Sequence, residues 1–139
     1  MALSRQKIKG RKVGGSFVSI PHAILEHDNY ARLSPRAVKC LLDLYAQYRG
    51  KNNGDLCAAL SIMRERGWRS KDQLQKAKNE LLQTKWIIQT KQGGLGIGPS
   101  LYAVTFKAID ECEGKLEVPP TTTAPGDWKT GTPPRIRGS

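Results

Sequence analysis

Apolar residues recur with a helical period between residues 70 and 83, and this stretch gives the clearest prediction in the chain. Their spacing of i, i+3, i+7 and i+8 indicates an amphipathic helix with one buried face. Ser70 suits the N-cap position, and Gln73 three residues later predicts a reciprocal capping box. The predicted buried stripe consists of Leu74, Ala77, Leu81 and Leu82. The opposite, polar face carries Arg69, Asp72, Gln73, Lys76, Asn79 and Gln83, with Gln75 at its edge.

A shorter helix is expected just before this one, over residues 61–66. The four residues 67–70 separate the two helices and include a glycine, which is the pattern of a helix-turn-helix. The exposed face of the longer helix holds side chains of the kinds that read base edges in DNA: Lys and Arg for guanine, Asn and Gln for adenine, Asp for cytosine. The same composition also fits an ordinary solvated helix face, so both interpretations stay open at this point.

Two runs rich in β-branched and aromatic residues follow, at 86–91 and 101–106. The loop between them contains four glycines and a proline, which predicts a β-hairpin with a long tip. The glycine-rich segment 93–99 is not expected to cradle a nucleotide phosphate, because it lacks a strand–loop–helix context and a closing Gly-Lys-Ser/Thr. Its tip is expected to rest on a DNA backbone instead, as a wing beside the two helices.

A scaffold helix is expected earlier in the chain. Ser34 suits its N-cap and Pro35 its first position, and Gly50 is expected to end it. The spacing of its apolar residues predicts one core-facing stripe, against which the longer helix would pack. That stripe consists of Val38, Leu41, Leu42, Tyr45 and Tyr48, with Cys40 as a small buried residue.

Short elements flank the scaffold helix on both sides. A helix opened by Pro21 is expected over residues 22–27. Residues 51–54 predict a tight turn, and residues 55–59 a short strand that pairs with the hairpin. The resulting order of helix, short strand, helix, longer helix, strand and strand is the order of a winged helix.

Several motifs of residues 16–107 match one superfamily. They are Leu33-Ser34-Pro35, Asn52-Asn53-Gly54, Gly67-Trp68-Arg69-Ser70 and Leu101-Tyr-Ala-Val-Thr. With these features the chain resembles the winged helix-turn-helix domains of small proteins from bacterial mobile elements and of plasmid replication initiators. The resemblance implies an α+β fold, mainly helical with a small antiparallel β wing. It also implies DNA binding through residues 69–76 and 91–100, although initiators usually carry a second winged domain, for which this chain would have no room.

The chain carries 23 basic and 12 acidic residues, a formal net charge of +11. Residues 1–15 contain five basic residues and no acidic ones, and residues 64–91 contain eight basic residues against three acidic ones, so each segment has a net charge of +5. Clustering of this kind favours a polyanionic partner, and its coincidence with the predicted helix-turn-helix favours duplex DNA. RNA is less favoured, because the aromatic residues fall on predicted core stripes and not on a stacking surface.

Three segments are predicted: a flexible basic arm over residues 1–15, a winged helix-turn-helix domain over 16–113 and a disordered tail over 114–139. Pro, Thr and Gly dominate the tail. Its Trp128 could be unstructured, fold back on the domain or dock on a partner protein. The arm is expected to clamp phosphates or a minor groove, although a solvated tail would have the same composition. Its basic residues are Arg5, Lys7, Lys9, Arg11 and Lys12.

The sequence shows no pattern typical of catalysis or metal binding. Its three cysteines are too few and too scattered for a disulfide framework or a zinc cluster, and His22 and His27 are not spaced to share one helical face. We therefore expect no enzyme, no metal and no cofactor. No apolar run approaches a membrane span or a signal sequence, so a reducing cytoplasm is the expected location.

The sequence thus predicts a sequence-specific protein that binds double-stranded DNA, most simply a small transcriptional regulator of a bacterial mobile element. The alternatives are a plasmid or phage replication or partition accessory protein that binds origin repeats, and a protein-interaction module on the same scaffold. A homodimer and a protein partner for the tail are left open. The residues expected to contact DNA are Arg69, Ser70, Lys71, Asp72, Gln73, Gln75, Lys76, Asn79 and Lys91.

Overall fold

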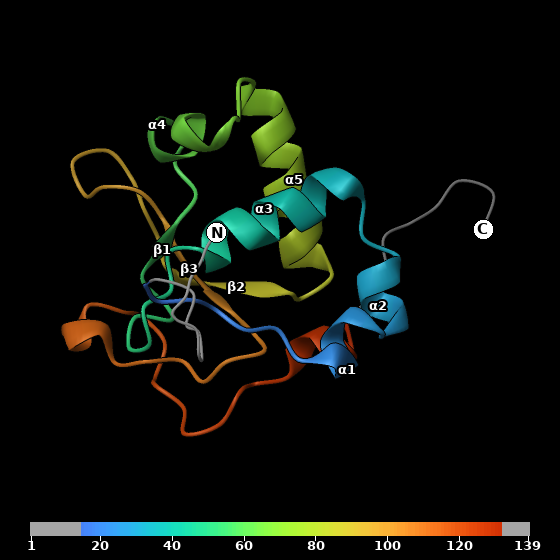
Figure 1. Ribbon diagram of the computed structural model, residues 1–139. Coiled ribbons are helices and arrows are strands. Elements are labelled where there is room, and N and C mark those ends of the chain that lie inside the picture. The colour runs from blue at the N-terminus through green and yellow to red at the C-terminus, as the bar shows by residue number, and fades with distance from the viewer. Residues whose placement is uncertain (1–14, 132–139) are drawn as a thin grey trace.

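The computed structural model describes residues 15–131 and has the expected α+β class, with helices packed on a small antiparallel sheet (Figure 1). The helices are α1 (His22–Leu25), α2 (Asp28–Ala31), α3 (Pro35–Tyr45), α4 (Leu60–Met63) and α5 (Lys71–Gln83). The strands are β1 (Leu56–Cys57), β2 (Ile87–Lys91) and β3 (Leu101–Val104). Short 3-10 turns lie at η1 (Arg64–Arg66), η2 (Cys112–Gly114) and η3 (Asp127–Lys129).

Helix α5 forms as its apolar period predicts. Leu74, Ala77 and Leu81 are buried, and Leu82 packs against the core from a half-buried position. Helix α3 crosses α5 on its inner side (Figure 1), and Glu80 ties the two together by accepting hydrogen bonds from the backbone nitrogen and hydroxyl of Ser34 at 2.9 and 2.6 Å. Helix α5 is therefore held by its buried face and, near its C-terminal end, by the hydrogen bonds of Glu80.

Helix α3 begins at the predicted cap, where Ser34 Oγ accepts a hydrogen bond from the Ala37 amide at 3.1 Å. Its predicted core stripe was partly wrong, because Leu42 is 43 % exposed and Val38 is only half-buried. The helix is rotated so that Ala37 and Cys40 lie on its buried side in place of Val38 and Leu42. It also ends at Tyr45, earlier than Gly50 suggested. The residues that α3 buries are Ala37, Cys40, Leu41, Asp43, Leu44 and Tyr45.

The three strands pair in the order β1-β3-β2, all antiparallel. The predicted hairpin is confirmed, although its strands are shorter than the two apolar runs, and β1 pairs with β3 as expected. The outer edge of β1 is covered by Gln47, whose side-chain amide makes two 2.8 Å hydrogen bonds with the backbone of Cys57. These bonds satisfy groups that an edge strand would otherwise leave open.

The predicted helix over 22–27 ends at Leu25, and a second short helix, α2, follows it over Asp28–Ala31, which corrects the sequence-based expectation. His27 leaves the helical conformation, and its Nδ1 accepts a hydrogen bond from the Asn29 amide at 3.0 Å. His27 therefore acts as the N-cap of α2 and not as the end of one continuous helix. The turn over 51–54 is confirmed by a 3.0 Å hydrogen bond from the Asp55 amide to the Asn52 carbonyl.

The tail is not disordered over residues 114–131, so the predicted domain boundary at residue 113 was wrong. Its backbone makes hydrogen bonds with the hairpin, among them Glu117 N to Thr90 O at 2.7 Å and Gly126 N to Thr105 O at 2.8 Å. Trp128 is only 5 % exposed and stacks on Trp86 with ring centroids 5.0 Å apart. Composition predicts that this segment has too few apolar residues to fold alone, but one tryptophan docks on an apolar site that the rest of the chain already provides.

Candidate nucleic-acid interface

The outer face of α5 carries most of the residues that the sequence predicts to contact DNA. The burial of Leu74, Ala77 and Leu81 on the inner side turns the opposite side to solvent. Ser70 is half-buried at the N-cap, and Lys91 is half-buried at the far end of β2, away from the others. The structure thus brings together all but one of the predicted set. Its exposed members are Arg69, Lys71, Asp72, Gln73, Gln75, Lys76 and Asn79.

Two of these residues have structural roles. Ser70 Oγ accepts a hydrogen bond from the Gln73 amide at 3.1 Å, which is one half of the predicted capping box. The reciprocal half does not form among the described residues, because the side-chain oxygen of Gln73 accepts a hydrogen bond from Arg36 of α3. A guanidinium is a stronger donor than a backbone amide, so the long-range partner prevails. The expected reciprocal box was therefore wrong.

Further along α5 the exposed side chains pair with one another. Lys76 lies 3.2 Å from Asp72, and Gln75 donates a hydrogen bond to Asn79 at 3.0 Å. Both are i, i+4 pairs on the surface, where each is worth only about 0.2–0.5 kcal/mol. Such pairs hold the side chains in extended positions along the helix, yet they can exchange for contacts with a ligand at little energetic cost.

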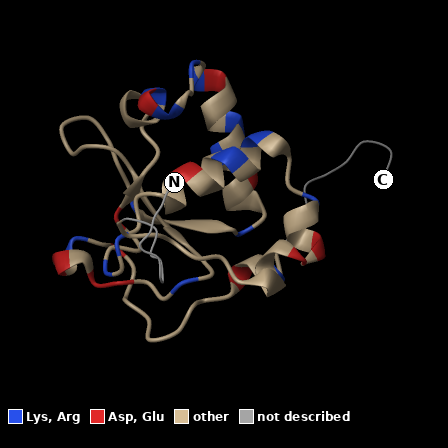
Figure 2. Cartoon of the chain, viewed as in Figure 1, with Lys and Arg blue, Asp and Glu red and all other residues tan. Residues whose placement is uncertain are grey.

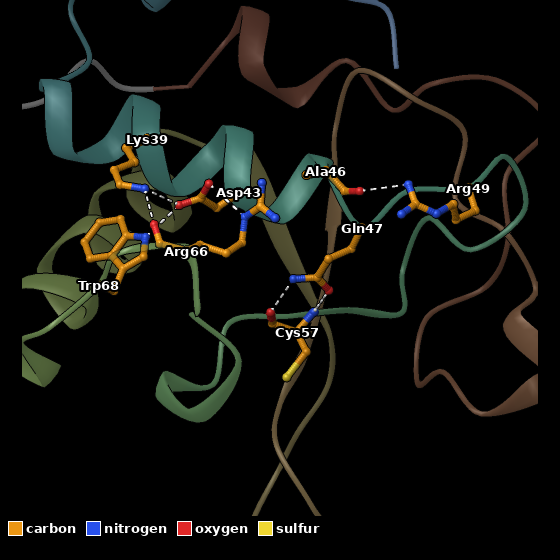
Figure 3. A network of polar contacts seen from close by, with 8 residues as sticks. All are labelled: Lys39, Asp43, Ala46, Gln47, Arg49, Cys57, Arg66 and Trp68. Carbon is orange, nitrogen blue, oxygen red and sulfur yellow. Dashed lines mark hydrogen bonds and ion pairs between the residues drawn. The ribbon is translucent and has the colours of Figure 1, made fainter. Parts of the chain in front are cut away.

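The turn that precedes α5 is anchored to α3 by one carboxylate, Asp43 (Figure 3). It accepts hydrogen bonds from Arg66 Nε at 3.0 Å and from the indole Nε1 of Trp68 at 2.8 Å. Lys39 approaches the same carboxylate to 2.9 Å and also donates to the Arg66 carbonyl at 2.7 Å. Three parts of the chain, namely α3, η1 and the turn before α5, therefore meet at Asp43.

This carboxylate is ionised at neutral pH despite its position. Burial would raise the pKa of Asp43, but hydrogen bonds from Lys39, Trp68 and Arg66 more than compensate and hold it below the ordinary value of 3.8. Its side chain is 10 % exposed. The charge on Asp43 thus neutralises cations beside the turn while fixing the start of α5.

Arg36 and Lys39 are site residues that the prediction missed. Both lie on α3, and together with Arg69 and Gln73 they line a shallow depression in front of the N-terminus of α5. The signal was available in the spacing of Arg36, Lys39 and Asp43, which fall at i, i+3 and i+7 on one polar stripe of a helix. The apolar period of the helix does not reveal this stripe, because it identifies only the buried face.

Cationic side chains gather on the elements around this depression. Figure 2 shows Lys and Arg segments along α3, η1 and the N-terminal half of α5, with acidic segments between them. Lys78 contributes on the hairpin side of α5, where its Nζ lies 5.7 Å from the centre of the Tyr102 ring. The surface therefore continues from the helices toward the β2–β3 hairpin.

Several other sequence-based expectations concern features outside this surface. The predicted arm residues, Arg5 to Lys12, lie outside the described residues. Within residues 15–131 no group of three or more His, Cys, Asp and Glu side chains could hold a metal ion. Every helix in that same range is too short or too polar to cross a lipid bilayer.

Comparison with protein-family models, with curated proteins and with solved structures finds no match for this chain. The functional assignment therefore depends on the residues and geometry described above.

Proposed function

We propose that the protein binds double-stranded DNA in a sequence-specific manner through a winged helix-turn-helix. In this proposal α4 and η1 are the first helix, α5 is the recognition helix and the β2–β3 hairpin is the wing. The observation that carries the proposal is the outer face of α5, where Lys, Gln, Asn and Asp side chains are exposed on a helix whose other face is fixed in the core. These side-chain types suit the hydrogen-bonding pattern of the major groove.

The placement of the cations supports the same function. Arg36, Lys39 and Arg69 surround the start of α5, where phosphates flanking a major groove would lie. A recognition helix enters the groove by its N-terminal residues, so phosphate contacts at this end would set its depth and register. Gln75, Lys76 and Asn79 then follow on the face that would meet the base edges.

We further propose that the DNA-bound protein acts as a small transcriptional regulator of a bacterial mobile element. A replication or partition accessory protein would use the same side chains for contact. The two roles differ in where the sites lie, because a regulator occupies promoters and an accessory protein occupies repeated sites at an origin.

The test is a genome-wide footprint of the tagged, full-length chain, followed by binding of the purified protein to the enriched duplex. We expect a small number of sites at promoters and an affinity that falls steeply with salt, because Lys and Arg contacts release condensed counterions. Enrichment of repeated sites at an origin would instead support the role of a replication or partition accessory protein. The absence of any enriched duplex, or an affinity independent of salt, would refute DNA binding by this surface.

A further inference from the structure

The tip of the β2–β3 hairpin, residues 92–100, differs in character from the surface around α5. It contains no charged residue, although the whole chain has a net charge of +11. Its two large side chains are apolar and project into solvent: Leu95 is fully exposed and Ile97 is 63 % exposed. Adjacent exposed apolar side chains of this size are unfavourable in water unless a partner covers them.

The tip is a formed loop that holds these side chains outward. Gly94 and Gly98 pair across it, with the Gly94 amide donating to the Gly98 carbonyl at 2.9 Å. The Ile97 amide donates back to the Gly94 carbonyl at 3.0 Å. At the base of the tip, a Cβ on Gly93 would lie 2.3 Å from the backbone nitrogen of Ser100, so only glycine permits this close approach of the two strands.

The polar side chains of the tip are already engaged in the hairpin. Gln92 accepts a hydrogen bond from Gln89 at 3.0 Å and donates to the Gly93 carbonyl at 3.2 Å. The hydroxyl of Ser100 accepts one from the Gly93 amide at 2.9 Å. The tip therefore offers no cation for phosphate, and its one side-chain amide, that of Gln92, bonds within the hairpin. What it presents outward is apolar surface.

The tip is rigidly connected to α5. Only residues 84–86 separate the helix from β2, and this connection is fixed by a 2.9 Å hydrogen bond from the Trp86 amide to the Leu81 carbonyl and by the complete burial of Trp86. In Figure 1 the tip and the N-terminal end of α5 both lie toward the top of the molecule, with α4 between them. A strand of five residues is about 17 Å long, which exceeds the ~12 Å width of a major groove. The hairpin is therefore long enough for its tip to span a groove of that width.

We infer that Leu95 and Ile97 form an apolar wedge that enters the minor groove of duplex DNA and partly unstacks a base step, so that the protein bends its site. Apolar side chains inserted in this way kink DNA toward the major groove. The inference rests on the proposed DNA binding by α5. It goes beyond that proposal because it gives the wing a deforming role in place of a phosphate contact.

The experiment uses the full-length protein and the duplex that the genomic footprint enriches, with fluorophores at the two ends for energy transfer and 2-aminopurine at the step beside the site. The test variant is Leu95→Ser/Ile97→Ser. One control is Leu95→Ile/Ile97→Leu, which keeps the apolar tip, and another is Leu25→Ser on α1, where the leucine is 41 % exposed and far from the hairpin in sequence. Thermal unfolding of each variant confirms that it is folded.

We expect the wild-type protein to bend the duplex by about 20–90° and to increase the 2-aminopurine fluorescence. The serine variant should protect the same site but lose the bend and the fluorescence change. Its affinity should be about tenfold lower, because the apolar burial gained by the wedge outweighs the cost of unstacking a base step. The leucine–isoleucine exchange and Leu25→Ser should behave like the wild type.

Three outcomes would overturn the inference. A wild-type protein that binds its site without bending it, together with unchanged affinity of the serine variant, would refute the wedge and leave DNA binding by α5 intact. Binding of the wild type, but not of the serine variant, to anionic lipid vesicles with no effect of the substitutions on DNA would assign the tip to a membrane surface. Failure of the wild type to bind any enriched duplex would refute the proposed function and the wedge together.

Discussion

The substitution Asp43→Ala should destabilise the protein strongly, because this carboxylate joins η1, the turn and α3. Its removal leaves the indole donor of Trp68 buried without a partner, since that side chain is only 6 % exposed. A buried unsatisfied donor costs about 1–3 kcal/mol. The ion pairs with Lys39 and Arg66 add less, about 0.2–1 kcal/mol each, because each cation is nearly half exposed. The sum is a loss of about 1.4–5 kcal/mol in the free energy of unfolding.

Urea unfolding followed by tryptophan fluorescence measures this loss, and a double-mutant cycle assigns it. In a Trp68→Phe background the indole donor is absent, so Asp43→Ala should cost less there by about 1 kcal/mol or more. Asp72→Ala is the matched control, because that aspartate forms an ion pair with a lysine at i+4 but is 70 % exposed. Equal losses for Asp43→Ala and Asp72→Ala, or no coupling between positions 43 and 68, would refute the role given to the network.

The same carboxylate predicts a pH dependence. The pKa of Asp43 is lower in the folded protein than its ordinary value of 3.8, since the hydrogen bonds from Lys39, Trp68 and Arg66 outweigh the effect of burial. The stabilisation by this group is therefore fully present above pH 4 or so and is lost as the pH falls through the folded pKa. Asp43→Asn should flatten this part of the stability profile in acid unfolding experiments. An unchanged profile would show that other carboxylates dominate it.

Three further perturbations test the core, the tail and the arm. Leu81→Ala should lower stability by about 2–5 kcal/mol in thermal unfolding, because Leu81 is completely buried in the middle of the α5 stripe. An unchanged melting temperature would show that Leu81 does not lie on the buried face of α5. Trp128→Ala should cost about 3–5 kcal/mol through loss of the stacked contact with Trp86, and a loss below 1 kcal/mol would mean that the tail contributes little to the fold. Deletion of residues 1–12 should weaken binding to cognate and random duplexes by similar factors and reduce the salt dependence of the affinity, because phosphate contacts carry no sequence information. If the deletion instead abolished the preference for the cognate duplex in competition binding, the arm would be the segment that recognises the base sequence.

Features that depend on local sequence were predictable. The Ser34 and Ser70 caps, the apolar stripe of α5 and the glycine-rich hairpin follow from residues within a few positions of one another, and the structure shows all of them. The exposed apolar side chains at the hairpin tip have a sequence signal too, since Leu95 and Ile97 stand among glycines with no charge nearby.

Features that depend on distant partners were not predictable in the same way. The rotation of α3 buries Ala37 and Cys40 and exposes Leu42, and the apolar period within α3 does not specify it. Trp128 finds its site on Trp86, a residue 42 positions earlier, so the composition of the tail alone indicated disorder. The partner of Gln73 is Arg36 for the same reason, because a contact between two helices competes with a local cap.

Competition binding with two glutamine variants of α5 tests the central claim most directly. Gln75 and Gln83 are both exposed on the same helix, but Gln75 lies in its N-terminal half and Gln83 at its C-terminal end. If Gln75 makes a bidentate base contact, Gln75→Ala should cost about 1–3 kcal/mol on the enriched duplex and much less on a scrambled one. Gln83→Ala should change neither affinity. Equal losses for the two variants, or undiminished discrimination by Gln75→Ala, would contradict the reading of DNA by the outer face of α5.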